Sequence, residues 1–149
     1  MTASAAVRDA SGLQRFLDAQ EGIHSTALAE LRAGRKRTHW MWFIFPQIAG
    51  LGTSSMAQRY ALASLDEARA YLSHAVLGRR LQECCEAVLA VEGRSAGALL
   101  GSPDDLKLRS CLTLFAAAEP ANKLFAHCLE KYFDGKGDMR TQALLAAAG

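Results

Sequence analysis

The residues best suited to chemistry lie in and around one aromatic segment in the first third of the chain. His39 has basic residues on one side and aromatic residues on the other. Its imidazole could act as a general acid or base, or donate a hydrogen bond to a phosphate. It could equally be a core histidine with one satisfied hydrogen bond. We therefore treat His39 as the candidate catalytic residue and leave its role open.

The two tryptophans of the chain, Trp40 and Trp42, both belong to this segment. Their size favours a position in the core, where each indole N–H would need a buried partner. If they line a cleft instead, their faces could stack on a base or a sugar. The sequence favours core anchors and keeps ligand binding as the alternative.

Polar groups border the aromatic segment on both sides. Residues 35–37 are Arg, Lys and Arg after Gly34, and cations at a helix C-terminus interact favourably with the helix dipole, which accounts for two of the three. Gln47 opens a glycine-containing loop, residues 47–53, that precedes a helix start. Such a loop either cradles an anion with its backbone N–H groups or simply connects two helices.

A second polar cluster is predicted far along the chain. Asp104, Lys107 and Ser110 recur at three-residue spacing and so share one helix face, with Arg109 nearby. Asp104 and Lys107 could form a surface ion pair worth under about 1 kcal/mol, or the stripe could face a cleft. Together with His39 it is the best candidate for a composite site, although it lacks a nucleophile–base–orienter motif.

Helices must position these residues, because helical periodicity dominates the chain and no segment alternates like a strand. We predict an all-α fold, a single compact domain of six to eight short helices over residues 11–149, after a flexible N-terminus, residues 1–10. The expected helices cover residues 11–33, 55–63, 65–72, 76–91, 103–118, 120–133 and 139–147, with a helical turn or two at 95–100 and the ambiguous segment at 39–44.

Capping residues set several of these boundaries. Serine or aspartate precedes most of the predicted helices, and Pro120 opens another. The predicted caps are Ser11 (with Gln14), Ser54 or Ser55, Ser64 (with Glu67), Ser102 (with Asp105) and Asp138.

The aromatic segment is the ambiguous element. Residues 40–45 have high strand propensity, but a lone strand would leave its backbone hydrogen bonds unmade. Thr38 could instead cap a short helix from His39 to about Ile44, which would stop before Pro46. We favour the helix.

Composition narrows the function classes. The net charge of +2 is small, so nucleic-acid binding through the basic cluster of Arg32 and residues 35–37 ranks last. No apolar run approaches the roughly 18 residues of a membrane span, and the N-terminus lacks a signal-peptide pattern. We therefore expect a cytoplasmic protein without membrane contact.

Cysteines and histidines give no metal pattern. The cysteines have neither CxxC nor zinc-type spacing, which favours buried free thiols. The histidines are scattered, so we predict no metal site and no cofactor. The residues concerned are Cys84, Cys85, Cys111 and Cys128, and His24, His39, His74 and His127.

Four blocks of the sequence resemble a known family. Residues 34–47, followed by Gly50-Leu51-Gly52, resemble the signature of the bacterial domain of unknown function 1810 family. Three later blocks, residues 71–81, 104–115 and 132–141, are similar to the rest of its pattern. The resemblance implies a small helical domain but no known activity, and Lys36, which belongs to the pattern, is the cation we expect to bind an anion.

Family members are sometimes labelled calpastatin-like. Inhibitors of that kind resemble disordered, charge-rich segments, whereas this chain is apolar and periodic. The label therefore gives no function here.

Three functional hypotheses follow. The first is a cleft near His39 and Trp40 that binds a small anionic or phosphorylated metabolite, such as a nucleotide. The second is a protein-interaction module without catalysis, which an exposed aromatic face would support. The third is weak nucleic-acid binding. Enzymatic activity and oligomeric state stay open. The residues assigned to the ligand are Lys36, His39, Trp40, Trp42, Gln47, Asp104, Lys107 and Ser110.

Overall fold

The structure, a computed structural model, describes residues 12–148, so the predicted flexible N-terminus and the Ser11 cap lie outside the described residues. The predicted all-α fold is confirmed: the described residues form ten helices, seven of them with seven or more residues, and no strand. They are α2 (Gln14–Gln20), α3 (His24–Arg32), α4 (Met41–Ile44), α5 (Ser55–Arg59), α6 (Leu65–Ser73), α7 (Leu77–Ala90), α8 (Ala96–Leu100), α9 (Asp104–Ala118), α10 (Leu124–Phe133) and α11 (Met139–Ala148).

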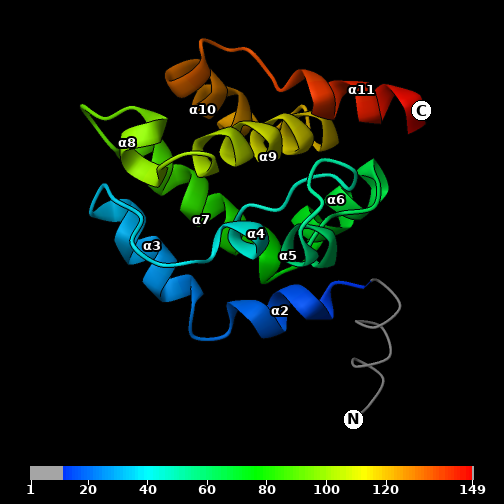
Figure 1. Cartoon of the computed structure of the whole chain (residues 1–149), viewed down its shortest axis with the longest axis horizontal. Helices are drawn as coiled ribbons and strands as arrows, with labels where there is room; N and C mark the ends of the chain where they lie inside the picture. The colour runs from blue at the N-terminus through cyan, green and yellow to red at the C-terminus, as the bar shows by residue number, and fades with distance from the viewer. Residues whose placement is uncertain (1–11, 149) are drawn as a thin grey trace.

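Most of the other helices pack on the two longest helices, α7 and α9 (Figure 1). Helix α3 packs on α7, whereas α8 and α11 pack on α9, and α6 and α10 contact both. This arrangement follows from sequence, because α7 buries its leucines and cysteines on one face and α9 is buried from Ser110 to Phe115. None of the described helices has the length and apolar character needed to cross a bilayer.

The helix predicted over residues 11–33 is in fact two helices. The chain leaves helical geometry after Gln20 and resumes at His24, and Gly22 has a φ of +72° in between. Glycine adopts this left-handed conformation without steric cost, so it can end a helix in the middle of a periodic apolar pattern. The pattern itself continues because both helices face the same core.

The aromatic segment forms a helix, as predicted, although only one turn long. Helix α4 begins at Met41, and Phe45 ends it before Pro46. Met41, Phe43 and Ile44 of this helix are buried and Trp42 is half-buried, and the flanking Trp40 and Phe45 are fully inaccessible. Thr38 does not cap this helix, because its hydroxyl donates to the Glu30 carboxylate at 2.7 Å instead.

Most predicted caps are confirmed. Ser54 and Ser64 accept from the backbone N–H groups three residues on, and Asp138 accepts from Thr141 N. Ser102 does not cap α9, because Pro103 occupies the cap position and its carbonyl accepts from Leu106 and Lys107.

Two predicted boundaries were wrong. Helix α10 begins at Leu124 rather than at Pro120, since the Asn122 side chain accepts from the Leu124 N–H. Helix α5 ends at Arg59 rather than near residue 63. The chain after it pairs instead with the segment before α5, where Ile48 and Leu62 form a parallel bridge.

The predicted burial of the four cysteines is confirmed, and all four are free thiols. Burial raises the pKa of the Cys84 thiol to about 12, so it stays protonated at neutral pH. Cys84, Cys85 and Cys111, whose thiol pKa values are all raised, act as core side chains rather than nucleophiles.

A buried carboxylate directs the chain between α3 and α4. Glu30 Oε1 accepts from Arg37 N at 2.8 Å, Thr38 N at 3.1 Å and Trp40 Nε1 at 2.9 Å. Burial alone would raise the pKa of Glu30, but these hydrogen bonds and the Thr38 hydroxyl outweigh it and lower the pKa from 4.5 to about 2. The ionised carboxylate therefore holds the loop in place.

We predict that Glu30→Gln destabilises the fold by roughly 2–3 kcal/mol at pH 7, because it removes the charge but keeps the shape. A lowered pKa means that this contribution is complete above about pH 4.5 and is lost as pH falls through about 2. Urea unfolding at pH 7, 4 and 3 measures it. The difference between the wild-type and variant free energies of unfolding should shrink with acidity.

Glu21→Gln is the matched control, since Glu21 is exposed. It should leave the free energy of unfolding within about 0.5 kcal/mol of the wild-type value. Equal stability of the Glu30 and Glu21 variants at pH 7 would show that the carboxylate does not organise the loop.

Candidate binding cleft

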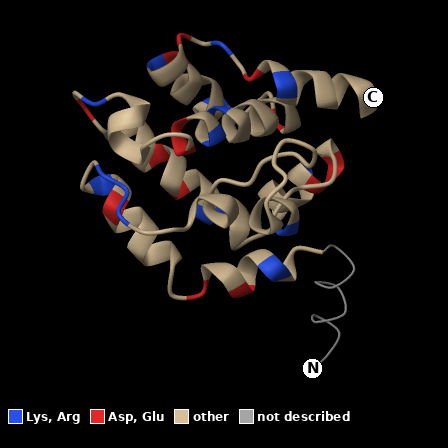
Figure 2. Ribbon diagram, in the orientation of Figure 1, with Lys and Arg blue, Asp and Glu red and all other residues tan. Residues whose placement is uncertain are grey.

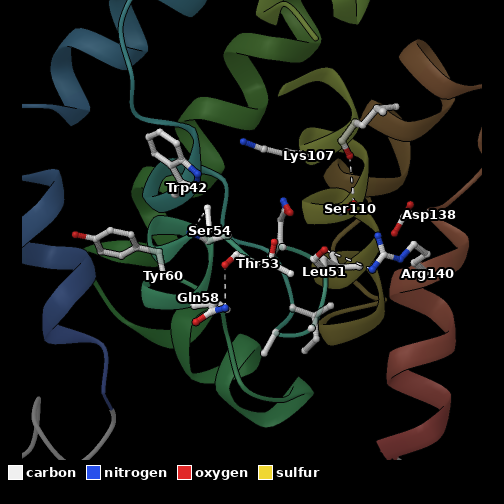
Figure 3. Close-up of a pocket in the computed structure, with 18 of the residues that line it drawn as sticks. Trp42, Leu51, Thr53, Ser54, Gln58, Tyr60, Lys107, Ser110, Asp138 and Arg140 are labelled. Carbon is white, nitrogen blue, oxygen red and sulfur yellow. Dashed lines mark hydrogen bonds between the residues drawn. The ribbon is translucent and has the colours of Figure 1, made fainter. Parts of the chain in front are cut away.

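A cleft of about 620 Å³ lies between the loop after α4 and the N-terminal half of α9. Its walls come from Trp42, residues 47–54, α5 and Tyr60 on one side, and from Pro103, Leu106, Lys107 and Ser110 on the other. Asp138 and Arg140, at the start of α11, close one end (Figure 3). We call it the α9 cleft. Its volume is in the range of small-molecule sites.

Backbone pairing positions the loop wall. Leu62 N donates to Gln47 O at 2.9 Å, and Ala49 N donates to Leu62 O at 2.8 Å. These two hydrogen bonds join the chain before α5 to the chain after it. Gly52 lies against α5, where an added Cβ would come within 2.6 Å of the Ala57 Cβ. The loop therefore lies close to α5 only because residue 52 has no side chain.

Three charges meet on the α9 side. Asp104 contacts Lys36 Nζ at 3.0 Å and Lys107 Nζ at 3.4 Å, so one carboxylate is shared between two ammonium groups. The predicted pair of Asp104 and Lys107 is present. Lys36 joins it because its backbone N–H donates to Leu99 O at 2.7 Å, which brings the residue beside α8 and α9.

Lys107 points across the cleft toward Trp42 (Figure 3). Its Nζ lies 5.1 Å from the centroid of the indole ring, within the range of a cation–π contact. The Lys107 side chain is 27% exposed, so it is not sealed off from the solvent of the cleft. This residue is the principal cationic group of the cleft.

Helix α11 supplies a second cation. Arg140 Nη2 donates to Leu51 O at 3.4 Å, and the Asp138 carboxylate caps the helix through Thr141 N and Oγ1. Asp138 N in turn donates to Thr113 Oγ1 at 2.8 Å, which anchors the start of α11 to α9. Arg140 therefore reaches the cleft from a segment fixed at its base.

Four hydroxyls line the cleft, those of Thr53, Ser54, Tyr60 and Ser110, and the fold already uses two of them. Ser54 Oγ accepts from Ala57 N, and Ser110 Oγ donates to Leu106 O. The described lining residues include no histidine or cysteine that could activate a hydroxyl.

The structure brings half of the predicted ligand residues together. Trp42, Gln47, Lys107 and Ser110 line the α9 cleft, and the loop suspected of cradling an anion forms one wall. Asp104 lies behind Lys107 as its ion-pair partner. The predicted contact between the aromatic segment and the distant polar stripe is therefore present, through Trp42 and Lys107.

Three other predicted residues lie elsewhere. His39 is exposed and does not line the cleft, because Glu30 holds its neighbours and leaves its own side chain outside. Trp40 is fully buried and is a core anchor. The Lys36 side chain is 9% exposed and paired with Asp104, so its ammonium is not offered to a ligand.

Sequence reasoning missed several lining groups. The spacing of Arg140 and Leu106 does not mark them as lining residues, because it does not show that α11 packs on α9 beside the loop. Arg109 was placed near the site, but its Nε donates to Lys136 O at 2.9 Å and anchors the loop before α11. Asp138 was predicted only as a cap, which it also is.

The comparisons agree with the fold and the motif. The family model described as "Protein of unknown function (DUF1810)" matches residues 10–145. The chain belongs to this family. The DUF1810 chain is also similar to the crystal structure of the conserved hypothetical protein Rv1873 from Mycobacterium tuberculosis, with 55% identity over 90% of this chain and 96% of that one and a TM-score of 0.89. No curated protein matches this chain.

We predict that iodide quenches the tryptophan fluorescence of this DUF1810 protein more strongly than caesium does. Trp42 is half-buried beside the Lys107 ammonium, which attracts anions, whereas Trp40 is inaccessible. Stern–Volmer titrations of the wild type and of Trp42→Phe measure the effect. The variant should lose most of the iodide quenching, and retention of that quenching would contradict the described exposures.

Proposed function

We propose that this protein binds a small anionic ligand, with an apolar or planar part, in the α9 cleft. The observation that carries the proposal is the position of Lys107, an accessible ammonium beside Trp42 in a cleft of small-molecule size. Such a group is the ordinary partner of a carboxylate or phosphate. A phosphorylated metabolite, such as a nucleotide, is the class we favour.

The charge balance of the cleft favours an anion. Lys107 and Arg140 contribute two positive charges and Asp138 one negative charge to the lining. The Asp104 carboxylate does not fully neutralise the charge of Lys107, because Lys36 shares that carboxylate. The local formal charge is thus positive by one, whereas positive and negative residues are interspersed over the rest of the ribbon (Figure 2).

The apolar lining suits the uncharged part of such a ligand. Leu51 and Ile48 line the loop side, and Leu106 projects from α9 with 54% of its surface exposed. An exposed leucine at the edge of a cleft can cover a ligand ring and lose its contact with water. This combination of apolar walls and a few cations is typical of metabolite sites.

The other two hypotheses receive less support. The interaction module relied on an exposed aromatic face, but Trp40, Met41, Phe43, Ile44 and Phe45 are all buried. The nucleic-acid hypothesis relied on four basic residues, and Lys36 among them is paired with Asp104. Exposed arginines remain beside it between α3 and α4 (Figure 2), too few for a binding stripe.

A thermal-shift screen against nucleotides, sugar phosphates and inorganic phosphate tests the proposal. A ligand at a hundredfold excess over its dissociation constant should stabilise the fold by about 2.7 kcal/mol, which raises the melting temperature by roughly 5–11 °C. In Lys107→Gln, binding should weaken about tenfold or more, because a charge-assisted hydrogen bond is removed. Arg140→Gln should weaken it in the same direction.

Two variants serve as controls. Lys123→Gln removes a lysine that is exposed and outside the cleft, and His39→Ala removes the exposed imidazole. Both should leave the ligand-induced shift unchanged. A shift that survives Lys107→Gln but disappears in His39→Ala would place the site beside His39 and contradict the α9 cleft.

A further inference from the structure

A second cavity, of about 780 Å³, lies where α6 ends and α7 begins, beside the connection from α9 to α10. It shares no lining residue with the α9 cleft. Besides Gln82, whose amide donates to Glu86 Oε2 at 3.4 Å, four of its lining side chains carry N–H donors on polar or charged groups: Arg69, His74, Arg79 and Asn122. The sequence block that contains His74 and Arg79 has no part in the proposed function of the α9 cleft.

His74 is held in one tautomer by the backbone. Its Nδ1 accepts from Val76 N at 3.1 Å and from Leu77 N at 3.3 Å, so it caps the start of α7. A neutral imidazole that accepts at Nδ1 carries its proton on Nε2. His74 therefore presents Nε2–H as a donor while its acceptor nitrogen is used by the fold.

Asn122 and Arg69 are oriented in the same way. Asn122 Oδ1 accepts from Leu124 N at 3.1 Å, which leaves its NH₂ group as a donor. Arg69 Nε donates to Ala118 O at 3.2 Å, and one terminal nitrogen contacts Asp66, which is 93% exposed. Its other terminal nitrogen has no partner among the described residues. Each side chain is fixed by at least one bond and keeps a donor free.

Arg79 adds an accessible charge without a partner among the described residues. It lies on the first turn of α7, and the lining includes one acidic residue, Glu119, against the two arginines. The close packing of α6 on α7 makes this geometry rigid. An added Cβ at Gly78 would come within 2.0 Å of Leu72 O, so the helices meet at backbone distance.

We infer that this cavity is a second binding site, for a ligand that carries an oxyanion such as phosphate. Its donors line one cavity from α6, the α6–α7 connection, α7 and the segment before α10, and three of the four are pre-oriented by bonds to the backbone. An oxyanion with several acceptor oxygens satisfies such an array. Helix α9 spans the distance between the two sites, since Lys107 lies in its first turns and Ala118 at its end.

Titration of the ¹⁵N-labelled chain with inorganic phosphate at constant ionic strength tests this inference. Saturable shifts are expected at the His74 Nε2–H and at the Arg79 Nε–H and backbone amide. Arg79→Gln should weaken the apparent affinity about tenfold. Asn122→Asp should weaken it too, since the new carboxylate keeps the cap on α10 and repels the anion.

Arg35→Gln is the matched control, because Arg35 is exposed and outside both cavities, and it should bind phosphate like the wild type. Lys107→Gln should also leave these shifts unchanged, which separates this site from the α9 cleft. Shifts that grow linearly without saturation, or an affinity that Arg79→Gln and Asn122→Asp leave unchanged in folded protein, would overturn the inference.

Discussion

The buried carboxylate of Glu30 is the constraint on which the α9 cleft depends. A carboxylate taken out of water must be satisfied, and here three hydrogen bonds from the α3–α4 loop to one oxygen and one to the other do so. Those bonds turn the chain after α3, bury Trp40 and start α4. Trp42 and the loop wall of the cleft follow directly from α4, so their position is set by this turn.

The same turn brings Lys36 to Asp104. The resulting arrangement of two lysines around one aspartate has a consequence beyond stability. Lys36 is nearly buried and satisfies one carboxylate oxygen at 3.0 Å, so Lys107 approaches the other oxygen and keeps its exposed side toward the cleft. A cation held but not neutralised in this way is what the proposed anion site requires.

Sequence alone predicted the helical fold well, because apolar periodicity and capping residues are local signals. Ser54, Ser64 and Asp138 mark helix starts for a reason visible within four residues of each. The break at Gly22 could not be predicted, since the apolar period continues across it. The apolar period continues because α3 packs on α7 and α2 packs on α4.

The α9 cleft was also predicted only in part, because only some of its residues give a local signal. Spacing placed Asp104, Lys107 and Ser110 on one face, and the structure adds the partner of that face, which is Trp42 and the loop. Lys36 and Trp40 are chemically distinctive, yet both stabilise the fold. Lys36 pairs with Asp104, which is distant in sequence, and the Trp40 indole donates to Glu30 in the earlier helix α3. No local pattern reports such pairings, nor the approach of Arg140 from α11.

The most direct test of the α9 cleft as an anion site is a crystal structure of the protein grown with sodium tungstate, whose tungsten gives anomalous scattering. We expect an anomalous peak within hydrogen-bond distance of Lys107 Nζ, on the cleft side opposite Asp104. An open cleft with Lys107 ordered beside Trp42 and no anion at the ammonium would contradict it.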